Sequence, residues 1–258
     1  MHIVISPSKS LDFENSCPKV SSTDLLFAEE AKKIMSVLKG FRPADLEKLM
    51  DISSSLAGLN YDRNQLWHHP FDGDSVRPAI YAFHGDVYEG LNAKTMAEGD
   101  IHFAQNHLSI LSGLYGLLRP LDAMMPYRLE MGIKLKIDTS ATLYRFWGSK
   151  IADQLNHRLQ LSGSEALINL ASNEYFKAVD AARLSVPVIT PVFKDEKNGK
   201  FQVISFYAKR ARGLMSRYII TQRLTNPEQL LGFNEEGYFF DPQLSEPDMP
   251  VFVRLQKK

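Results

Sequence analysis

The sequence predicts an α+β fold, that is, an irregular α/β fold in which a mixed sheet is surrounded by helices. Short runs rich in β-branched residues are mixed with amphipathic helical stretches, without the regular βαβ spacing of a doubly wound protein. Hydrophobic residues make up 44% of the chain, enough for a sizeable core. No repeat, low-complexity tract or long linker divides residues 1–258, so we expect a single compact domain.

Strand signals open the chain and recur along it. His2–Ile5 is a short apolar run, and small polar residues follow it. The dipeptide Asn198-Gly199 between the β-rich runs Val186–Phe193 and Phe201–Tyr207 is the strongest hairpin signal in the chain. The other expected strands are Ala79–Phe83, Ile110–Leu118 with a bulge, Ala166–Ala171, and two edge strands at Gly237–Phe240 and Val251–Val253.

Apolar residues three and four apart predict the helices. Thr23 is the expected N-cap of a helix over Ala28–Leu38, and Gly40 is its expected stop. Ser53–Trp67 is also helical in pattern, with a break expected at Gly58. The remaining expected helices are Ala44–Met50 with Pro43 in its first turn, Val87–Leu91, Thr95–His107, Thr142–Leu159, Glu174–Leu184 and Ala208–Gln222.

The cysteine count and the hydropathy pattern limit the possible compartments and cofactors. Cys17 is the one cysteine, which excludes a disulfide framework and a multi-cysteine metal site. Residues 1–10 do not resemble a signal peptide, and no run approaches the roughly 20 apolar residues that span a bilayer. We therefore expect a cytoplasmic protein with no membrane partner. The seven histidines form no ligand motif, so no metal or cofactor is predicted.

The charge is balanced overall but uneven along the chain. Lys and Arg number 30, as do Asp and Glu, which excludes a protein that binds nucleic acid by bulk charge. Residues 194–223, however, carry eight basic and two acidic side chains. Within this segment Lys209, Arg210, Arg212 and Arg217 follow Phe206-Tyr207, an arrangement suited to phosphates and stacked bases. A solvated helix face with acidic partners elsewhere explains the same pattern equally well.

Residues 43–67 resemble a helix-hairpin-helix element. In such an element an apolar, glycine-containing turn joins two short helices, and its backbone N–H groups hold a DNA phosphate without reading sequence. Leu56–Asn60 is the candidate turn, in which Gly58 permits close backbone approach and Asn60 replaces the usual second glycine. An ordinary helix break packed on the core is the alternative interpretation.

Three loops contain residue types that commonly take part in catalysis or anion binding. Lys9 follows the first strand among serines, where it is placed to bind a phosphate, and Asp12 would orient it or act as a base. Arg128 and Glu130 would bind an anion and serve as a general base, or would simply tie a loop to the core. Glu174 stands at another strand-to-helix junction, where helix capping explains it equally. Asp12, Glu130 and Glu174 are therefore the candidate catalytic residues.

Seven segments, in order along the chain, resemble the YaaA family of bacterial peroxide-stress proteins. They are Ile5–Asp12, Phe83–Tyr88, Leu111–Asp122, Pro126–Gly132, Phe146–Gly148, Asn169–Lys177 and Ser205–Gly213. His84 departs from some members, which have a lysine there, and Cys17 lies in a poorly matching segment.

The resemblance implies a function and a set of site residues. The family is associated with resistance to hydrogen peroxide through limited free iron and reduced DNA damage. It has a helix-hairpin-helix element, which falls at Gly58 and Asn60, and a positive cleft in an unusual α/β fold. The implied cleft residues are Lys9, Arg128, Lys209, Arg210, Arg212 and Arg217. The implied partner is DNA, double-stranded or damaged and branched, and no protein partner is inferred.

Two function classes follow from these observations. The first is a cytosolic stress protein that binds DNA with little sequence preference. The alternative is an enzyme acting on a nucleotide, a nucleobase or a damaged base, with an extruded base in a pocket. Direct iron binding is a third possibility, with only scattered histidines to support it.

Overall fold

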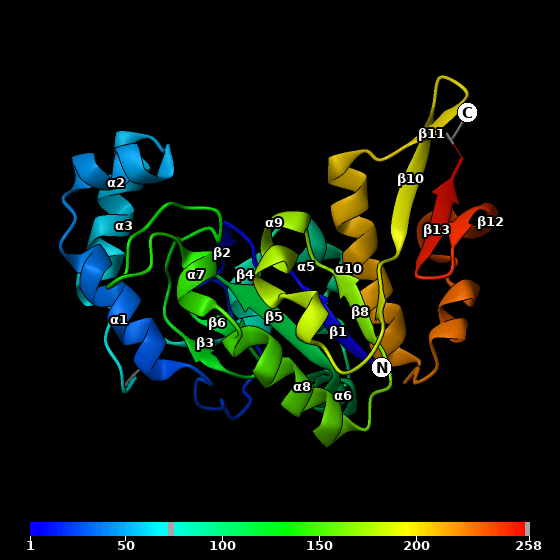
Figure 1. The fold of residues 1–258 in the computed structure, drawn as a ribbon, viewed down its shortest axis with the longest axis horizontal. Helices are drawn as coiled ribbons and strands as arrows, with labels where there is room; N and C mark the ends of the chain where they lie inside the picture. Colours follow the sequence, from blue (N-terminus) through cyan, green and yellow to red (C-terminus); the bar gives the residue numbers. More distant parts are fainter. Residues whose placement is uncertain (72–74, 256–258) are drawn as a thin grey trace.

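The computed structural model describes residues 1–71 and 75–255, and its centre is a mixed sheet (Figure 1). The strand order is β6-β5-β1-β8-β9, in which β5, β1, β8 and β9 are parallel and β6 is antiparallel to β5. The strands are β1 His2–Ile5, β5 Leu108–Ser112, β6 Gly116–Leu118, β8 Leu167–Leu170 and β9 Val188–Ile189. Helices surround this sheet, which confirms the predicted fold class.

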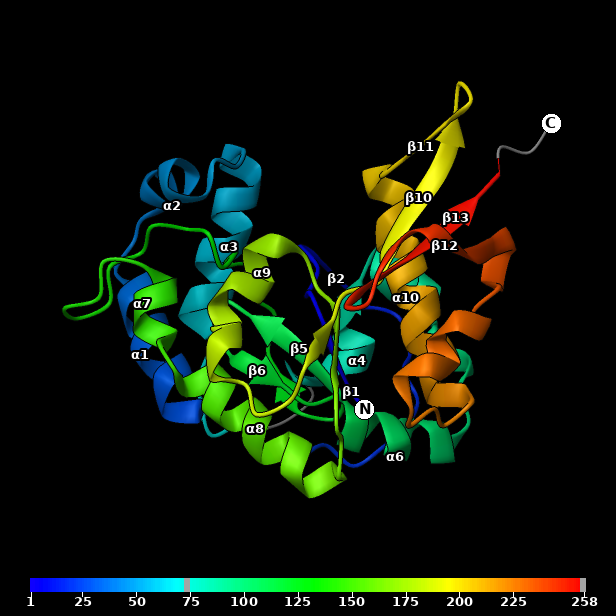
Figure 2. The same cartoon turned by 45° about the vertical axis from the view of Figure 1, so that its right-hand side comes forward.

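Helices α1–α3 and α10 mark the two ends of the long axis of the molecule, and the remaining helices lie around the central sheet between them (Figures 1 and 2). The α1–α3 group lies at one end, and α10 lies at the other beside a second sheet. The α-helices are α1 Ala28–Lys39, α2 Pro43–Met50, α3 Ser54–Leu66, α4 Ala79–Ala82, α5 Asp86–Leu91, α6 Glu98–His107, α7 Leu143–Trp147, α8 Lys150–Ser162, α9 Asn173–Phe176 and α10 Ser205–Thr221. Across the described ranges, no helix combines the length and the apolarity needed to cross a bilayer.

The second sheet contains the predicted hairpin. Its order is β11-β10-β13-β12, and the β10–β11 turn has positive φ at both Asn198 (54°) and Gly199 (72°), as Asn-Gly predicts. The strands are β10 Val192–Lys197, β11 Lys200–Gln202, β12 Tyr238–Glu246 and β13 Met249–Arg254. Smaller ladders join β2 Ser10–Leu11 to β4 Phe83–His84, and β3 Arg77–Pro78 to β7 Ala123–Met124.

The outer strand of this sheet is irregular. β12 is at the sheet edge, as expected, but its register against β13 shifts between Asp241 and Glu246, and it contains Pro242. The expectation of a second edge strand at Val251–Val253 is wrong, because β13 pairs with β10 on one side and β12 on the other.

Several predicted strand boundaries are wrong for physical reasons. Ala79–Ala82 is a helical turn, and Phe83 begins β4. All five side chains are buried, so the run has no hydrophobic period that could distinguish a helix from a strand. Ile110–Leu118 is a tight β5–β6 hairpin rather than one bulged strand, with Gly116 at a φ of 65°. Of the expected strand at Phe201–Tyr207, only residues up to Gln202 belong to a paired strand, and α10 begins at Ser205.

Predicted helix ends also differ where side chains have tertiary partners. Thr23 does not cap α1; its hydroxyl donates to Asp122 at 2.6 Å, and Phe27 precedes the helix. The helix expected over Thr142–Leu159 is divided into α7 and α8 at Gly148, where φ is 49°. Likewise, the helix expected over Glu174–Leu184 is the short α9 followed by 3-10 turns.

The break predicted at Gly58 is wrong. Gly58 lies inside the continuous helix α3, and Asn60 is 1% exposed with its amide donating to the Leu56 carbonyl. The turn between α2 and α3 lies earlier, at Asp51, which adopts a left-handed φ of 51°. Residues 57–60 therefore have their N–H groups bonded within the helix, and the Leu56 N–H bonds the N-cap side chain of Ser53, so this stretch does not form a phosphate-binding turn.

Helices α5 and α10 cross with their backbones in contact. A Cβ added to Gly213 would lie 1.9 Å from the Val87 carbonyl oxygen, and one added to Gly90 would lie 2.3 Å from that of Arg210. Both obstacles are backbone atoms, which cannot rotate away. The two glycines therefore allow an approach that any other residue would prevent.

We predict that Gly213→Ala lowers the free energy of unfolding by about 1–3 kcal/mol or more, because the methyl group forces the two helices apart. Urea unfolding followed by circular dichroism measures the change.

Gly58→Ala is the matched control within the same fold. A Cβ at Gly58 meets nothing within 4 Å, so alanine should raise stability by up to about 1 kcal/mol through helix propensity. Equal stability of Gly213→Ala and the unmodified protein would contradict the close-crossing interpretation.

Candidate functional site

A cavity of about 500 Å³ opens at the carboxyl ends of the parallel strands β1 and β8. Its lining includes Ser8 and Lys9 from the loop after β1, Ser172 after β8, and two cations of α10. Ligands of open α/β sheets characteristically bind at this edge, where the connections of neighbouring strands diverge.

Hydrogen bonds hold the loop after β1 against its neighbours. The Ser6 hydroxyl accepts a hydrogen bond from the Ser172 amide at 2.8 Å. The Tyr88 hydroxyl of α5 donates to the Ser6 carbonyl at 3.0 Å. Ser172 in turn caps α9, because its hydroxyl accepts from the Tyr175 amide. The loops after β1 and β8 and the helix α5 are thus fixed relative to one another around the cavity.

A second close approach brings Glu130 to the cavity. A Cβ on Gly113, which directly follows β5, would lie 2.3 Å from the Leu129 carbonyl oxygen. The Tyr127 and Ser112 hydroxyls share a hydrogen bond of 2.6 Å. The loop that carries Glu130 therefore runs against the end of β5.

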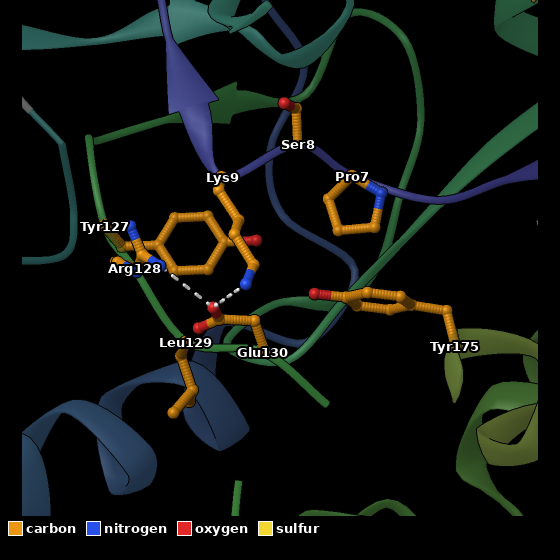
Figure 3. Close-up of a pocket in the computed structure, with 8 residues that line it drawn as sticks. All are labelled: Pro7, Ser8, Lys9, Tyr127, Arg128, Leu129, Glu130 and Tyr175. Carbon is orange, nitrogen blue, oxygen red and sulfur yellow. Dashed lines mark hydrogen bonds and ion pairs between the residues drawn. The ribbon is translucent and has the colours of Figure 1, made fainter. Parts of the chain in front are cut away.

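Glu130 is the most buried carboxylate of the cavity, with 9% exposure (Figure 3). Its Oε1 accepts from Lys9 Nζ at 3.0 Å and from an Arg128 terminal nitrogen at 3.2 Å. Its Oε2 is buried and has no hydrogen-bond partner in the described part of the chain, and the same holds for Arg128 Nε. Two cations thus hold the carboxylate while one oxygen remains unused.

Tyrosines line the cavity around this carboxylate. In Figure 3 the Tyr175 hydroxyl points toward Glu130. Burial raises the pKa of Tyr175 and of Tyr127, so both phenols keep their protons at neutral pH and can donate hydrogen bonds.

The two α10 cations in the lining have no carboxylate partner among the residues that the structure describes. Arg212 is partly buried, and burial alone lowers the pKa of its guanidinium. Lys209, one turn earlier, is exposed at the mouth. These two side chains therefore present positive charge to the cavity without forming an ion pair within the described chain.

Arg210 and Arg217, expected in the same cleft, make other contacts. Arg210 Nε donates to Glu236 at 3.0 Å, and Arg217 donates to the Asn92 carbonyl at 2.9 Å. These contacts connect α10 to the turn before β12 and to the end of α5. Of the six implied cleft cations, the structure brings four together at this edge: Lys9, Arg128, Lys209 and Arg212.

Asp12 and Glu174 serve structural contacts. The expectation that Asp12 orients Lys9 is wrong. The Asp12 carboxylate contacts Lys94 at 2.9 Å and Arg77 at 3.3 Å instead. Glu174 lines the cavity, but its Oε1 accepts from the Gly132 amide at 2.9 Å. Of the three candidate carboxylates, only Glu130 is buried and has an oxygen without a hydrogen-bond partner in the described part of the chain.

The site includes residues that the sequence did not single out. Ser6, Ser172, Tyr88 and Tyr175 form its walls and hydrogen bonds, and all lie in segments with the family resemblance. Their signal was position immediately after a predicted strand or near a helix start. Within the described ranges, no three His, Cys, Asp or Glu side chains are placed to hold a metal ion.

A family model described as "Peroxide stress protein YaaA" matches residues 1–244. The chain belongs to this family. It is also similar to a "UPF0246 protein" of Saccharophagus degradans, at 52% identity over 256 residues, covering 99% of this chain and 100% of that protein. Membership of the YaaA family confirms the resemblance seen in the sequence and supports a role in oxidative stress.

We predict that Asp12 stabilises the fold at neutral pH and that this stabilisation is lost as the pH falls. Burial alone would raise its pKa, but hydrogen bonds from Lys94 and the Asn15 amide outweigh burial and lower the pKa to about 2. A depressed carboxylate pKa stabilises the native state above the unfolded value of about 3.9, and the contribution disappears as pH falls toward the folded value.

Urea unfolding of the Asp12→Asn variant between pH 2 and pH 7 tests this prediction. The variant should be less stable at neutral pH, and the difference should shrink below about pH 4. A difference that stays constant across this range would show that Asp12 contributes through packing alone.

Proposed function

We propose that this protein is a cytoplasmic peroxide-stress protein that binds DNA with little sequence preference and so limits oxidative, iron-dependent DNA damage. The observation that supports this most is the unpartnered pair Lys209 and Arg212 on α10. An uncompensated cation that is partly buried is costly, and an anionic ligand would remove that cost.

Two exposed aromatic rings lie in the first turn of the same helix, and Tyr207 lines a separate cavity with Asp195 and Arg254. Phe206 and Tyr207 are 54% and 41% exposed, and they lie within one turn of Lys209. The Arg254 guanidinium lies 4.6 Å from the Tyr207 ring centre, covering one of its faces. Cations beside exposed rings suit a flexible or distorted strand, in which bases can stack on aromatic side chains.

The chemistry of these contacts explains why little sequence preference is expected. Lysine and arginine contacts to phosphates position a nucleic acid but carry no sequence information. Stacking likewise accepts every base.

We predict that the double variant Lys209→Glu/Arg212→Glu loses most of its affinity for DNA. Fluorescence anisotropy of labelled duplex, single-stranded and branched DNA across a salt series measures this. The slope of log K against log salt should fall in magnitude by about 0.9 for each duplex phosphate that is no longer neutralised, or about 2 for the pair.

Lys33→Glu/Lys39→Glu supplies the matched control, since it makes the same charge change on α1 at the opposite end of the molecule (Figure 1). This variant should keep its affinity apart from a small long-range effect. Equal losses in the two double variants would show that net charge, rather than the α10 surface, determines binding, and would contradict the proposal.

Glu130 favours a second candidate function, an enzyme acting on a nucleotide, a nucleobase or a damaged base. A carboxylate that lines a cavity and is held by two cations is suited to accept a proton from a bound substrate. Lys9 and Arg128 would hold the carboxylate in place, since both contact its Oε1.

For this second function we predict that Glu130→Gln lowers turnover about 100-fold or more, measured on protein whose melting curve shows that it is folded. Chromatography of nucleotides, nucleosides and base-damaged oligonucleotides after incubation with the protein is the assay. If Glu130→Gln retained the turnover rate of the wild type, Glu130 would have no role in the reaction.

A further inference from the structure

Helix α3 buries polar side chains and exposes apolar ones. Its buried face consists of Ala57, Asn60 and Asn64, and each asparagine is 1% exposed. Asn60 Oδ1 and both amide atoms of Asn64 have no hydrogen-bond partner in the described part of the chain. Leu59 and Leu66, in contrast, are 45% and 71% exposed. A surface helix normally has the opposite polarity, so α3 presents to solvent a face that is suited to burial.

The exposed leucines lie on one stripe of the helix. At about 100° per residue, Leu59 and Leu66 differ by only about 20° around the helix axis, because they are seven residues apart. Leu56, which is also exposed, lies about 60° from Leu59. Apolar residues at a seven-residue spacing are typical of a helix that packs along the length of another helix. The stripe is therefore suited to a second helix.

Two charged residues flank this stripe on opposite sides. Helical geometry places Asp62 about 50° to one side of the line through Leu59 and Leu66, and Arg63 about 50° to the other. Neither side chain forms an ion pair with another described residue. Burial and, second, the positive charge of Arg128 lower the pKa of Arg63. The surroundings of Arg63 thus add positive charge and supply no counter-ion.

A parallel contact between two copies of α3 would satisfy both features. In a parallel pair around a two-fold axis, each leucine of the stripe faces its own counterpart. Opposite flanks of the two helices then meet, so Asp62 of each copy lies beside Arg63 of the other. An antiparallel pair would instead place Asp62 beside Asp62. Charge complementarity therefore favours a second copy of this chain, in the parallel orientation, as the occupant of the stripe.

We propose that α3 forms a homodimer contact in which Leu59 and Leu66 pack across a two-fold axis and Asp62 pairs with Arg63 of the second copy. The helix has 13 residues and is about 20 Å long, so the contact is small and the dimer should be weak. The α10 surface lies at the other end of the molecule and stays open in both copies (Figure 1). The contact therefore does not depend on the proposed functions.

Analytical ultracentrifugation of the full-length protein between about 5 and 500 µM tests the contact. The weight-average mass should rise with concentration toward twice the monomer mass. Leu66→Glu should weaken dimerisation at least about tenfold, because each copy loses a buried leucine and places a carboxylate there. Leu161→Glu is the matched control, since Leu161 on α8 is 74% exposed, and it should change nothing. A monomer at every concentration, or equal effects of the two variants, would overturn the proposal.

Charge reversals test the orientation of the two helices. Asp62→Arg and Arg63→Asp should each weaken dimerisation about three- to tenfold, because each places like charges on both flanks of the pair. An equimolar mixture of the two variants should dimerise as the unmodified protein does, since each contact between positions 62 and 63 then joins opposite charges. Circular dichroism checks that both variants are folded. A mixture that associates no better than either variant alone would refute this pairing.

A cross-link reports the geometry directly. Ser55 is exposed and lies about 30° from the line through Leu59 and Leu66, so it faces its counterpart in a parallel pair. Ser55→Cys in a Cys17→Ser background should therefore form an intermolecular disulfide under mild oxidation, and Leu161→Cys in the same background should not. Dimerisation of the Ser55→Cys protein without this cross-link would contradict the parallel contact.

Discussion

The contact of α5 with α10 at Gly90 and Gly213 is the constraint on which the site depends. Helix α5 contacts the loop after β1 through the Tyr88 hydroxyl. Helix α10 carries the unpartnered cations. Because backbone meets backbone, the crossing fixes the distance between the sheet and α10 more strictly than side-chain packing would. Gly113 plays the same part for the loop that carries Glu130. Three glycines thus set the width of the cavity from two sides.

Mixed charge, rather than uniform positive charge, characterises the space these contacts enclose. Two of its cations are occupied by Glu130, and two on α10 are not. Lys9 and Arg128 are therefore committed to an internal ion pair, whereas Lys209 and Arg212 form none within the described residues.

The sequence predicted the fold class, most helices and the Asn-Gly hairpin, because periodicity and turn chemistry are local properties. It identified Lys9, Arg128, Glu130, Lys209 and Arg212, which the structure brings to one edge. Pairing could not be predicted: the partner of Arg210 is Glu236, 26 residues away, and that of Lys9 is Glu130 rather than Asp12. Gly58 misled because burial of Ala57, Asn60 and Asn64 carries α3 through a residue that disfavours helix. Tertiary contacts decided each of these cases.

The irregular course of β12 has a consequence for self-association. An exposed sheet edge offers a row of free N–H and C=O groups on which a strand from another molecule can add. In β12 that row is interrupted, because Pro242 has no amide hydrogen and the register shifts before Glu246. A second copy therefore finds no regular ladder to extend along the β12 edge of the C-terminal sheet.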